Sequence, residues 1–484
     1  MRLKFDKLLL VPLLLVLCSC SSLKISESTS ERMIAIKSDG APALYSIVKP
    51  SGDVLSKSDY DYDQQLKSIM RGIKDSGRKK ILIFVFGGMN SLDSTVERTE
   101  NLSKIIYKES DYYPIFINWE SSLADSYFDH LLFIRRGVKS YTFGPVLFPF
   151  YLVVDIARAV TRLPINLVFQ SYGIFMGNTN TDEINGVDAE RIRKLKIKYY
   201  VGEDYEPDYY PALRRFVYLL GFPVRVVTTA LIDVAGKSAW DVMMRRSRIV
   251  FQRSQPFEAD FSDEVNALTS PPDGALSIFM DRLVKFYKAN PEYEFTLIGH
   301  SMGPFIINGI LSRYDMLPYK NIVYMAPACS CEETAQALRP YLEKHPESTF
   351  YNLCIHPHMD ASEMMFWAVL PRGSVLRWID LYLADPLTSN DHCLGVWLNA
   401  MYSMPRLLGK VQKQCVIKAF GLYDPVTNTA RLNMPQKHTD FSDPVLRFWE
   451  PKFWQIPQNK ISPQSCPFID RVGSYRRLES KYKK

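Results

Sequence analysis

The chain has 484 residues, of which 47% are hydrophobic and 23% are charged. That is enough apolar material for a large core, and the length allows two to three domains. The formal net charge of +7 is mildly basic; it suits a surface near anionic lipid headgroups but gives no support for nucleic acid as a partner.

The N-terminus has the pattern of an export signal. Residues 1–19 join a basic start to an apolar run from Leu8 to Leu17, which is too short for a membrane span of about 20 residues. The residues Leu17-Cys18-Ser19-Cys20 resemble the lipobox of bacterial lipoproteins, and this resemblance implies that Cys20 is diacylated. Ser21 in the next position implies sorting to the outer membrane. An ordinary cleaved signal peptide is the alternative; either way the chain leaves the cytoplasm, with a formal net charge of +5.

Elements of alternating type follow a Ser-rich tether, residues 20–32. Short strands are expected between Met33 and Val48, then a helix from about Gln64 that Gly77 ends, and then a helix opened by a capping box at Ser94. Apolar runs predict buried strands at Lys80–Phe86, Tyr113–Trp119, Phe295–Ile298, Asn321–Met325, Thr349–Ile355 and Cys415–Leu422. The alternation predicts an α/β fold with a mostly parallel sheet and right-handed crossovers.

A long segment interrupts this rhythm. We expect residues 33–120 and 265–455 to form the two halves of the core, residues 121–264 an insertion, and residues 456–484 a tail. Asp155, Arg158 and Arg162 fall on one face of an apolar stretch and predict an amphipathic helix, and Lys194–Tyr199 alternates like a strand. A lid, a membrane-contacting surface at residues 140–176 and plain core packing all remain open for the insertion.

The most informative motif is Gly299-His-Ser301-Met-Gly303, between an apolar strand and an apolar helix start. This is the pattern of a nucleophile elbow, in which a sharp turn lifts the serine hydroxyl above the sheet. Ser301 is therefore the predicted nucleophile. A serine hydroxyl needs a base to take its proton and a third group to orient that base.

The partners of such a serine follow it in the chain, first the acid and then the histidine. Five histidines qualify by position: His345, His356, His358, His392 and His438. His438 is the predicted base because it lies in a polar loop after the last apolar strand, and His392 is its main competitor. Asp360 is the predicted acid because it follows the strand Thr349–Ile355, with Glu363 and Asp380 as alternatives.

The tetrahedral intermediate of acyl transfer needs amide donors for its oxyanion. The amide of Met302 is one predicted donor, since it starts the helix after the elbow. The amide of Gly88, in the loop after the first long strand, is the other, because glycine lets a carbonyl approach closely. The string His356-Pro-His358-Met-Asp360 also permits a zinc site, but no further ligand-like cluster accompanies it, and we expect no metal or organic cofactor.

Six cysteines follow Ser301, at positions 329, 331, 354, 393, 415 and 466. An exported chain can oxidise them, and six cysteines allow fifteen pairings that the sequence does not choose among. Free thiols and a disulfide framework both remain open.

Together, the strand ending in Phe86-Gly-Gly-Met-Asn-Ser, the elbow and the late His438 resemble the α/β-hydrolase superfamily over residues 64–120 and 265–450. The resemblance implies a serine hydrolase for carboxylic esters, and the apolar insertion suggests a lipid or other hydrophobic ester. An acyltransferase with the same triad and a non-catalytic envelope lipoprotein are the alternatives. Phe86 stands where the family usually has histidine, and Pro304 stands where a small residue is commoner. The oligomeric state cannot be read from the sequence.

Overall fold

The structure is a computed structural model that describes most of the chain. The described residues are 23–135, 138–139, 144–175, 196–202, 220–253, 273–363, 370–371, 373–421 and 434–456. Three of the predicted features therefore lie outside them: the export signal, the acylated Cys20 and the tail after residue 456.

A central sheet of eight strands runs through the molecule in the order β2-β6-β5-β10-β11-β12-β13-β9, and every neighbouring pair is parallel. Two small sheets, β1-β3-β4 and β7-β8, lie outside it. The strands are β1 Lys24–Ser26, β2 Met33–Ile36, β3 Ser46–Val48, β4 Val54–Leu55, β5 Lys80–Val85, β6 Tyr112–Trp119, β7 Ile134–Arg135, β8 Val138–Lys139, β9 Lys198–Val201, β10 Glu294–His300, β11 Tyr319–Met325, β12 Thr349–Cys354 and β13 Cys415–Ala419.

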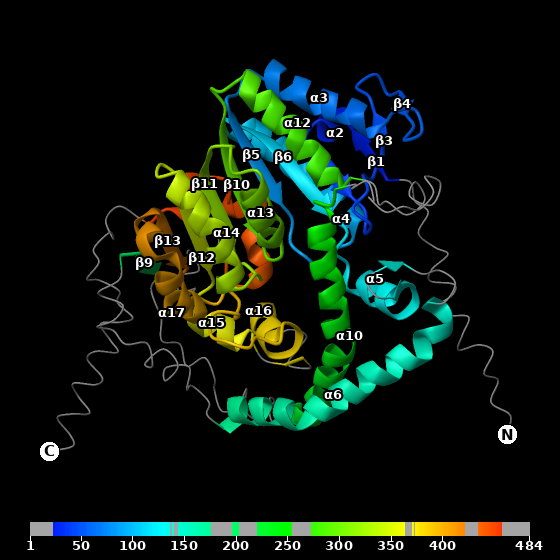
Figure 1. The fold of residues 1–484 in the computed structure, drawn as a ribbon, viewed down its shortest axis with the longest axis vertical. Coiled ribbons are helices and arrows are strands. Elements are labelled where there is room, and N and C mark those ends of the chain that lie inside the picture. The colour runs from blue at the N-terminus through cyan, green and yellow to red at the C-terminus, as the bar shows by residue number, and fades with distance from the viewer. Residues whose placement is uncertain are drawn as a thin grey trace, which may run out of the picture.

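Helices cover both faces of the sheet. In Figure 1, α12, α13 and α14 lie in front of the strands, and α4 lies on the opposite face. The α-helices are α2 Glu27–Ser30, α3 Tyr62–Asp75, α4 Leu92–Glu109, α5 Leu123–Phe128, α6 Gly144–Phe175, α10 Phe222–Ile249, α12 Ala275–Ala289, α13 Gly303–Arg313, α14 Cys331–Lys344, α15 Pro357–Ser362, α16 Val375–Trp378, α17 Trp397–Leu408 and α18 Pro451–Trp454. The prediction of an α/β fold with a mostly parallel sheet is thus confirmed.

The order of the strands defines a crevice at the middle of the sheet. From β5 the chain moves outward to β6, whereas from β10 it moves the other way, through β11 and β12. The direction of winding therefore reverses between β5 and β10. In open α/β sheets, sites form outside the carboxyl ends of the strands at such a reversal.

Several element boundaries follow directly from local chemistry. The helix α3 begins after Asp61, whose carboxylate accepts a hydrogen bond of 2.7 Å from the amide of Gln64, and Gly77 beyond its end has a φ of +68°. The predicted start of α4 is wrong by three residues, because Ser91 and not Ser94 caps it. The segment expected as a tether, residues 20–32, is folded from β1 onward.

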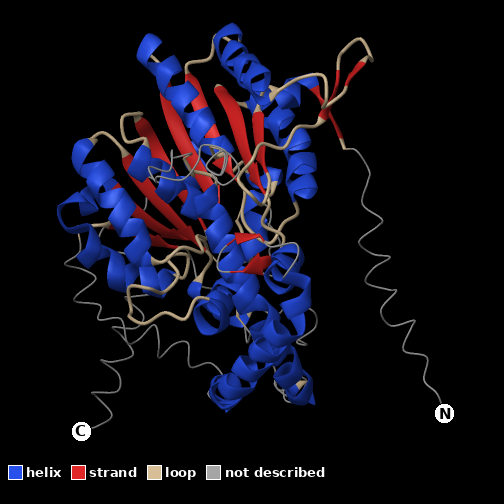
Figure 2. Ribbon diagram, turned by 45° about the vertical axis from the view of Figure 1, so that its right-hand side comes forward, coloured by secondary structure: helices blue, strands red, loops and turns tan. Residues whose placement is uncertain are grey.

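The range expected as an insertion is not separate from the core. Its strand β9 pairs with β13 and extends the central sheet, and the ring of Trp240 in α10 meets that of Phe305 in α13 at 5.9 Å between centroids. Figures 1 and 2 show α6 and the adjoining end of α10 projecting beyond the sheet. Within the described part, no helix combines the length and apolar character needed to cross a membrane.

Candidate functional site

Ser301 occupies a sharp turn between β10 and α13. Its φ is +55°, a left-handed conformation that a residue with a side chain adopts only under strain. The turn is fixed on both sides, since the amide of Ser301 donates to the carbonyl of Met325 at 3.0 Å and its carbonyl accepts from the amide of Ala328 at 2.8 Å. The backbone therefore holds the serine in the geometry expected of a nucleophile elbow.

The two glycines of the motif are required by close packing. A Cβ on Gly303 would lie 2.4 Å from the carbonyl oxygen of Val85, and a Cβ on Gly299 would lie 2.7 Å from a methyl of Ile307. Both distances are well below van der Waals contact. A larger residue at position 303 would push α13 away from β5, and one at position 299 would displace Ile307 or Pro304 of α13, so the motif has a physical reason at each position.

The loop after β5 lies directly against the elbow. A Cβ on Gly87 would lie 2.8 Å from Cβ of Ser301, and one on Gly88 would lie 2.1 Å from Sδ of Met302. The side-chain amide of Asn90 holds the loop by donating to the carbonyls of Gly87 and Gly88, at 3.3 and 2.8 Å. The structure therefore brings together the two residues predicted as oxyanion donors.

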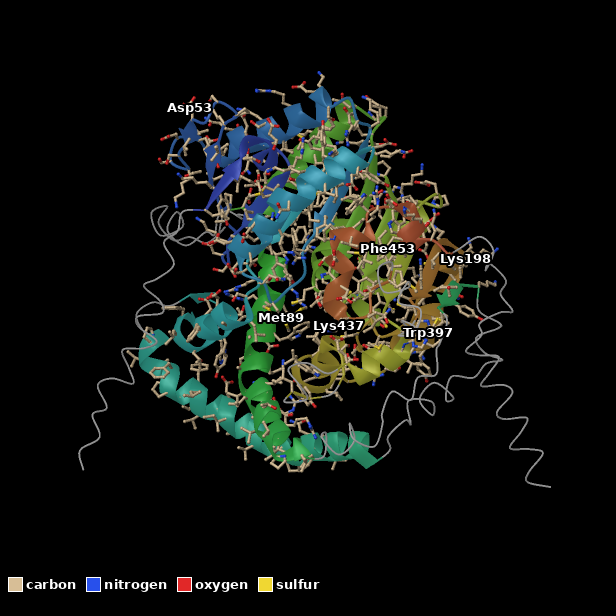
Figure 3. All side chains as sticks on the ribbon, turned by 180° about the vertical axis from the view of Figure 1, so that it is seen from behind. Asp53, Met89, Lys198, Trp397, Lys437 and Phe453 are labelled. Atoms are coloured by element: carbon tan, nitrogen blue, oxygen red, sulfur yellow. The ribbon has the colours of Figure 1, made fainter. Side chains whose placement is uncertain are left out.

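His438 lies at the same end of the sheet. It begins a short 3-10 helix, His438–Ser442, and is buried. His300, which directly precedes Ser301, places its Nε2 3.0 Å from the carbonyl oxygen of His438, and the two rings are 5.1 Å apart. Met89 and Lys437, the chain neighbours of Gly88 and His438, are labelled at this end of the sheet in Figure 3.

Burial keeps both imidazoles neutral. It lowers the pKa of His300 to about 4, and it lowers the pKa of His438 well below the usual value, an effect to which the neighbouring His300 adds. The Nδ1 atom of His438 is buried without a hydrogen-bond partner among the described residues. No hydrogen bond within the described part joins the Ser301 hydroxyl to His438. A neutral imidazole is the form that a general base needs.

The predicted acid, Asp360, is buried but is engaged elsewhere. Its two carboxylate oxygens accept from the hydroxyl of Ser374 and, at 2.8 Å, from Nε of Arg377. No described contact joins it to the imidazole of His438. The structure thus places Asp360 near the site but assigns its oxygens to partners that the sequence did not indicate.

Glu363, an alternative acid in the sequence, lies closer to His438. Burial raises the pKa of Glu363 to about 7, the charge of Asp360 raises it further, and the backbone of His438 opposes the shift. Its Oε2 is buried and has no hydrogen-bond partner among the described residues. Glu363 and His438, which contact each other in space, therefore each carry one unsatisfied buried atom, Oε2 and Nδ1. Such atoms are unusual in folded proteins.

The raised pKa of Glu363 predicts a pH effect on stability. Between the ordinary value of 4.5 and about 7, the folded chain keeps a proton on Glu363 that the unfolded chain has lost. This stabilisation is complete below the lower value and is lost as the pH rises through the upper one. Relative to Glu363→Gln, the wild type is expected to lose on the order of 3 kcal/mol over this interval.

Urea unfolding at a series of pH values measures this difference. Subtracting the variant's curve removes the opposite contribution of the buried histidines, which remains in both proteins. Glu97→Gln, at an exposed position, is the matched control and should leave the pH dependence unchanged. Parallel curves for the wild type and Glu363→Gln would contradict the burial of an ionisable Glu363.

His392, the competing candidate for the base, and Asp380, an alternative candidate for the acid, pair with each other. Nδ1 of His392 lies 3.2 Å from Oδ2 of Asp380, and this pairing raises the pKa of His392. The side chain of His392 is half-exposed. Within the described part, no contact joins either residue to Ser301. No group of metal-binding side chains is found there either, although the side chain of His358 lies outside the described residues.

Of the two interpretations left open by the sequence, free thiols or a disulfide framework, the described cysteines favour free thiols. All five are buried, and none forms a disulfide bond: Cys329, Cys331, Cys354, Cys393 and Cys415. A disulfide framework among these five is thus contradicted. Cys466 and the predicted lipidation site, Cys20, lie outside the described residues.

The contact between His300 and His438 was not predicted from the sequence. The position of His300 directly before Ser301 was visible, but its contact with the backbone of His438 depends on how two segments 138 residues apart meet. Ser374 and Arg377 were also missed, because nothing in the sequence connects them to Asp360.

The comparisons with known proteins identify no relative. No family model, no curated protein and no solved structure matches the chain.

Proposed function

We propose that the protein is a serine hydrolase of the α/β-hydrolase type that cleaves carboxylic esters through an acyl-enzyme on Ser301. The observation that carries this proposal is the strained backbone of Ser301 at the carboxyl end of β10, with the Gly87–Gly88 loop packed against it. Strain of this kind persists where the surrounding structure enforces it, and it is concentrated at active sites.

In the proposed reaction, Nε2 of His438 takes the proton of the Ser301 hydroxyl as its oxygen attacks the ester carbonyl. The amides of Met302 and Gly88 stabilise the negative oxygen of the tetrahedral intermediate. Collapse of the intermediate breaks the ester bond, and His438 gives its proton to the departing alcohol. Water then repeats the sequence on the acyl-enzyme and releases the carboxylic acid.

The group that orients His438 is proposed to come from the acidic pair Asp360 and Glu363. Asp360 is the residue expected from the sequence, but its oxygens already serve Ser374 and Arg377. Glu363 has an unsatisfied oxygen and contacts the backbone of His438, whose imidazole Nδ1 is also unsatisfied. The contacts therefore favour Glu363, with Asp360 as a neighbour whose charge raises the pKa of Glu363.

A hydrophobic acyl group is the proposed substrate class. Met89 follows Gly88 directly and leaves 39% of its surface exposed beside the proposed oxyanion loop. An exposed apolar side chain at this point suits an acyl chain better than a polar substrate. We further propose, from the resemblance of the N-terminus to a lipobox, that Cys20 carries a lipid anchor and that the protein acts at the bacterial outer membrane.

The test is hydrolysis of 4-nitrophenyl esters of increasing chain length by the full chain, with product analysis in the presence and absence of an added alcohol. Free acid as the main product in both conditions supports the hydrolase. A transferred ester as the main product would replace it with the acyltransferase. No turnover of any ester, together with an intact fold, would contradict both.

One observation favours a non-catalytic scaffold as the second candidate. Ser301 and His438 share no hydrogen bond in the described contacts, and only 8% of the Ser301 surface is exposed. Catalytic hydrogen bonds are often long in proteins without a bound substrate, so this geometry does not exclude catalysis. The scaffold predicts that substitution of Ser301 changes no measurable activity.

The proposed oxyanion loop gives a steric prediction. Gly88→Ala would bring a Cβ to 2.1 Å from Sδ of the buried Met302 side chain, so that side chain or the loop must shift, and where the loop shifts, loss of one oxyanion donor lowers turnover by about 10²-fold or more. The double variant Gly88→Ala with Met302→Ala removes the obstructing side chain but keeps the Met302 amide. Recovery of at least about tenfold in the double variant is expected, measured as kcat/KM on a short-chain ester. Full activity of Gly88→Ala alone would contradict the assignment.

A further inference from the structure

The helices α6 and α10 turn their charged side chains toward each other. Asp155 of α6 and Asp233 of α10 are 2% and 0% exposed. Arg158 and Arg162, which follow Asp155 along the same face, lie between the helices and retain less than a third of their side-chain exposure. The polar face predicted from the sequence is thus the inner face of the pair.

These buried charges have partners in the pair and in the segments beside it, since His130 lies 3.1 Å from Asp155 and Asp385 lies 2.9 Å from Arg162. Arg158 lies 3.6 Å from Asp155, and Arg162 lies 3.5 Å from Asp233. Asp155 also accepts from the hydroxyl of Ser238 at 2.9 Å, and Asp233 accepts from the side-chain amide of Asn166 at 3.2 Å. Buried charges are tolerated only with such partners.

The opposite side of the same helices is apolar. We define the outer face as the exposed side chains of residues 144–168 and 220–236. On α6 it includes Val146, Phe150 and Val153, at 73%, 65% and 63%, and Val227 and Leu231 continue it on α10. Each set follows the three- and four-residue spacing of one helical face.

This arrangement reverses the usual one. A water-soluble helix buries its apolar side and exposes its charges, because each Å² of apolar surface kept from water contributes about 25 cal/mol. Here the charges are inside and the aliphatic side chains are outside. Inward-facing charges and outward-facing apolar side chains are what a lipid environment selects.

The chemistry of the outer face also favours lipid over protein as the partner that covers it. Among its described side chains, the only polar group is the hydroxyl of Thr161, which already donates to the carbonyl of Arg158 at 2.7 Å. Protein interfaces carry about one hydrogen bond per 100–200 Å² and a polar rim. The described outer face offers a protein partner only the acceptor lone pairs of that one hydroxyl, whereas acyl chains require no hydrogen bond.

We propose that the outer face docks on a lipid bilayer, with α6 lying along the membrane surface. A helix of 32 residues extends about 48 Å, and Pro149 and Pro164 bend it, so that it follows an arc at the edge of the molecule (Figure 1). Helices that immerse only an apolar face bind in the plane of the interface. Trp240 of α10 packs against Phe305 of α13, the helix that follows Ser301. Docking of α6 and α10 would therefore fix the orientation of the candidate site relative to the membrane.

Photolabelling from the membrane interior tests this proposal. The full chain is reconstituted in vesicles of phosphatidylethanolamine and phosphatidylglycerol that contain a phospholipid with a diazirine on its acyl chain. After irradiation, labelled peptides are identified by mass spectrometry. Peptides from residues 144–168 and 220–236 are expected to carry at least about tenfold more label than those with Leu387 or Val445, which are 92% and 64% exposed elsewhere.

A matched pair of variants distinguishes docking from general exposure. Val153→Glu with Val227→Glu places charges on the outer face and should lower its labelling by about tenfold or more. Leu387→Glu with Val445→Glu adds the same charge elsewhere and should change nothing. Circular dichroism melting must show both variants folded, and Val153→Lys with Val227→Lys replaces the first variant if it is not.

Three results would overturn the proposal: label spread evenly over the surface, undiminished label in the charged-face variant, or crosslinks between two copies through the outer face without acyl-chain label. Reaction of Ser301 with a fluorophosphonate is recorded on the same samples. If Ser301 is unreactive while the outer face is strongly labelled, the hydrolase proposal is contradicted and the docking proposal is supported.

Discussion

Replacement of Ser301 by alanine is expected to lower ester turnover by about 10⁴-fold or more, because the acyl-enzyme has no other oxygen on which to form. The measurement is kcat on a short-chain 4-nitrophenyl ester. The fold should be unaffected, since the hydroxyl makes no hydrogen bond among the described residues and its removal leaves no new unsatisfied group. Turnover within about tenfold of the wild type would contradict the role of Ser301.

Two further substitutions control this result. Ser312→Ala lies on the same helix, α13, where the hydroxyl only donates to the carbonyl of Asn308, and it should leave turnover unchanged. Ser301→Gly should be as inactive as Ser301→Ala but more stable by about 1 kcal/mol, because glycine relieves the strain of a φ of +55°. Equal stability of these two inactive variants would contradict a strained elbow.

Replacement of His438 by glutamine is the second large effect, with an expected loss of about 10³- to 10⁴-fold in kcat/KM. Glutamine keeps much of the volume in a buried position but accepts no proton at neutral pH. Because burial holds the pKa of His438 well below its usual value, the Glu363→Gln variant, which lacks the other group that titrates near this pH, should keep its residual activity as the pH falls through about 6.5, where an ordinary histidine becomes protonated. The pH profile of kcat/KM measures this.

His392→Gln is the matched control for His438→Gln. His392 pairs with Asp380 on a half-exposed side chain, so its loss should change turnover by no more than about twofold. A large loss in His392→Gln with an active His438→Gln would transfer the base to the pair of His392 and Asp380. An acidic limb near about pH 6.5 that persists in the Glu363→Gln variant would contradict the buried, neutral His438.

The strands of the central sheet could be predicted because burial on both faces leaves a clear record in the sequence. Runs such as Lys80–Val85 and Glu294–His300 are apolar without alternation, and their predicted bounds differ from the observed ones by at most two residues. The start of α4 was missed because Ser91 and Ser94 are both plausible caps. Only the backbone decides between them.

The site was predictable where chain-local chemistry defines it. Ser301, Met302 and Gly88 follow from a motif and from the ends of two strands, and the structure brings them together. The acid was not predictable to the same degree, because Asp360 and Glu363 lie three residues apart on one segment. Which oxygen remains free depends on Ser374 and Arg377, which approach from another part of the chain.

The insertion shows a different limit of sequence reasoning. Its pattern correctly placed Asp155, Arg158 and Arg162 on one face of a helix, but periodicity alone does not say which face turns outward. The same range holds buried residues, such as Trp240 and Met243 of α10, and largely exposed ones, such as Val146 and Val153 of α6. A strand was predicted at Lys194–Tyr199, but β9 is Lys198–Val201 and shares only two residues with it, and its pairing with β13 is a long-range contact.

Covalent labelling of the full chain by a fluorophosphonate is the most direct measurement of the central claim. The probe reacts only with a serine that a neighbouring base activates. The account predicts a single adduct, mapped by mass spectrometry to the peptide that contains Ser301, and its loss in both Ser301→Ala and His438→Gln. A folded chain that takes no label, or one labelled equally in the His438→Gln variant, would contradict it.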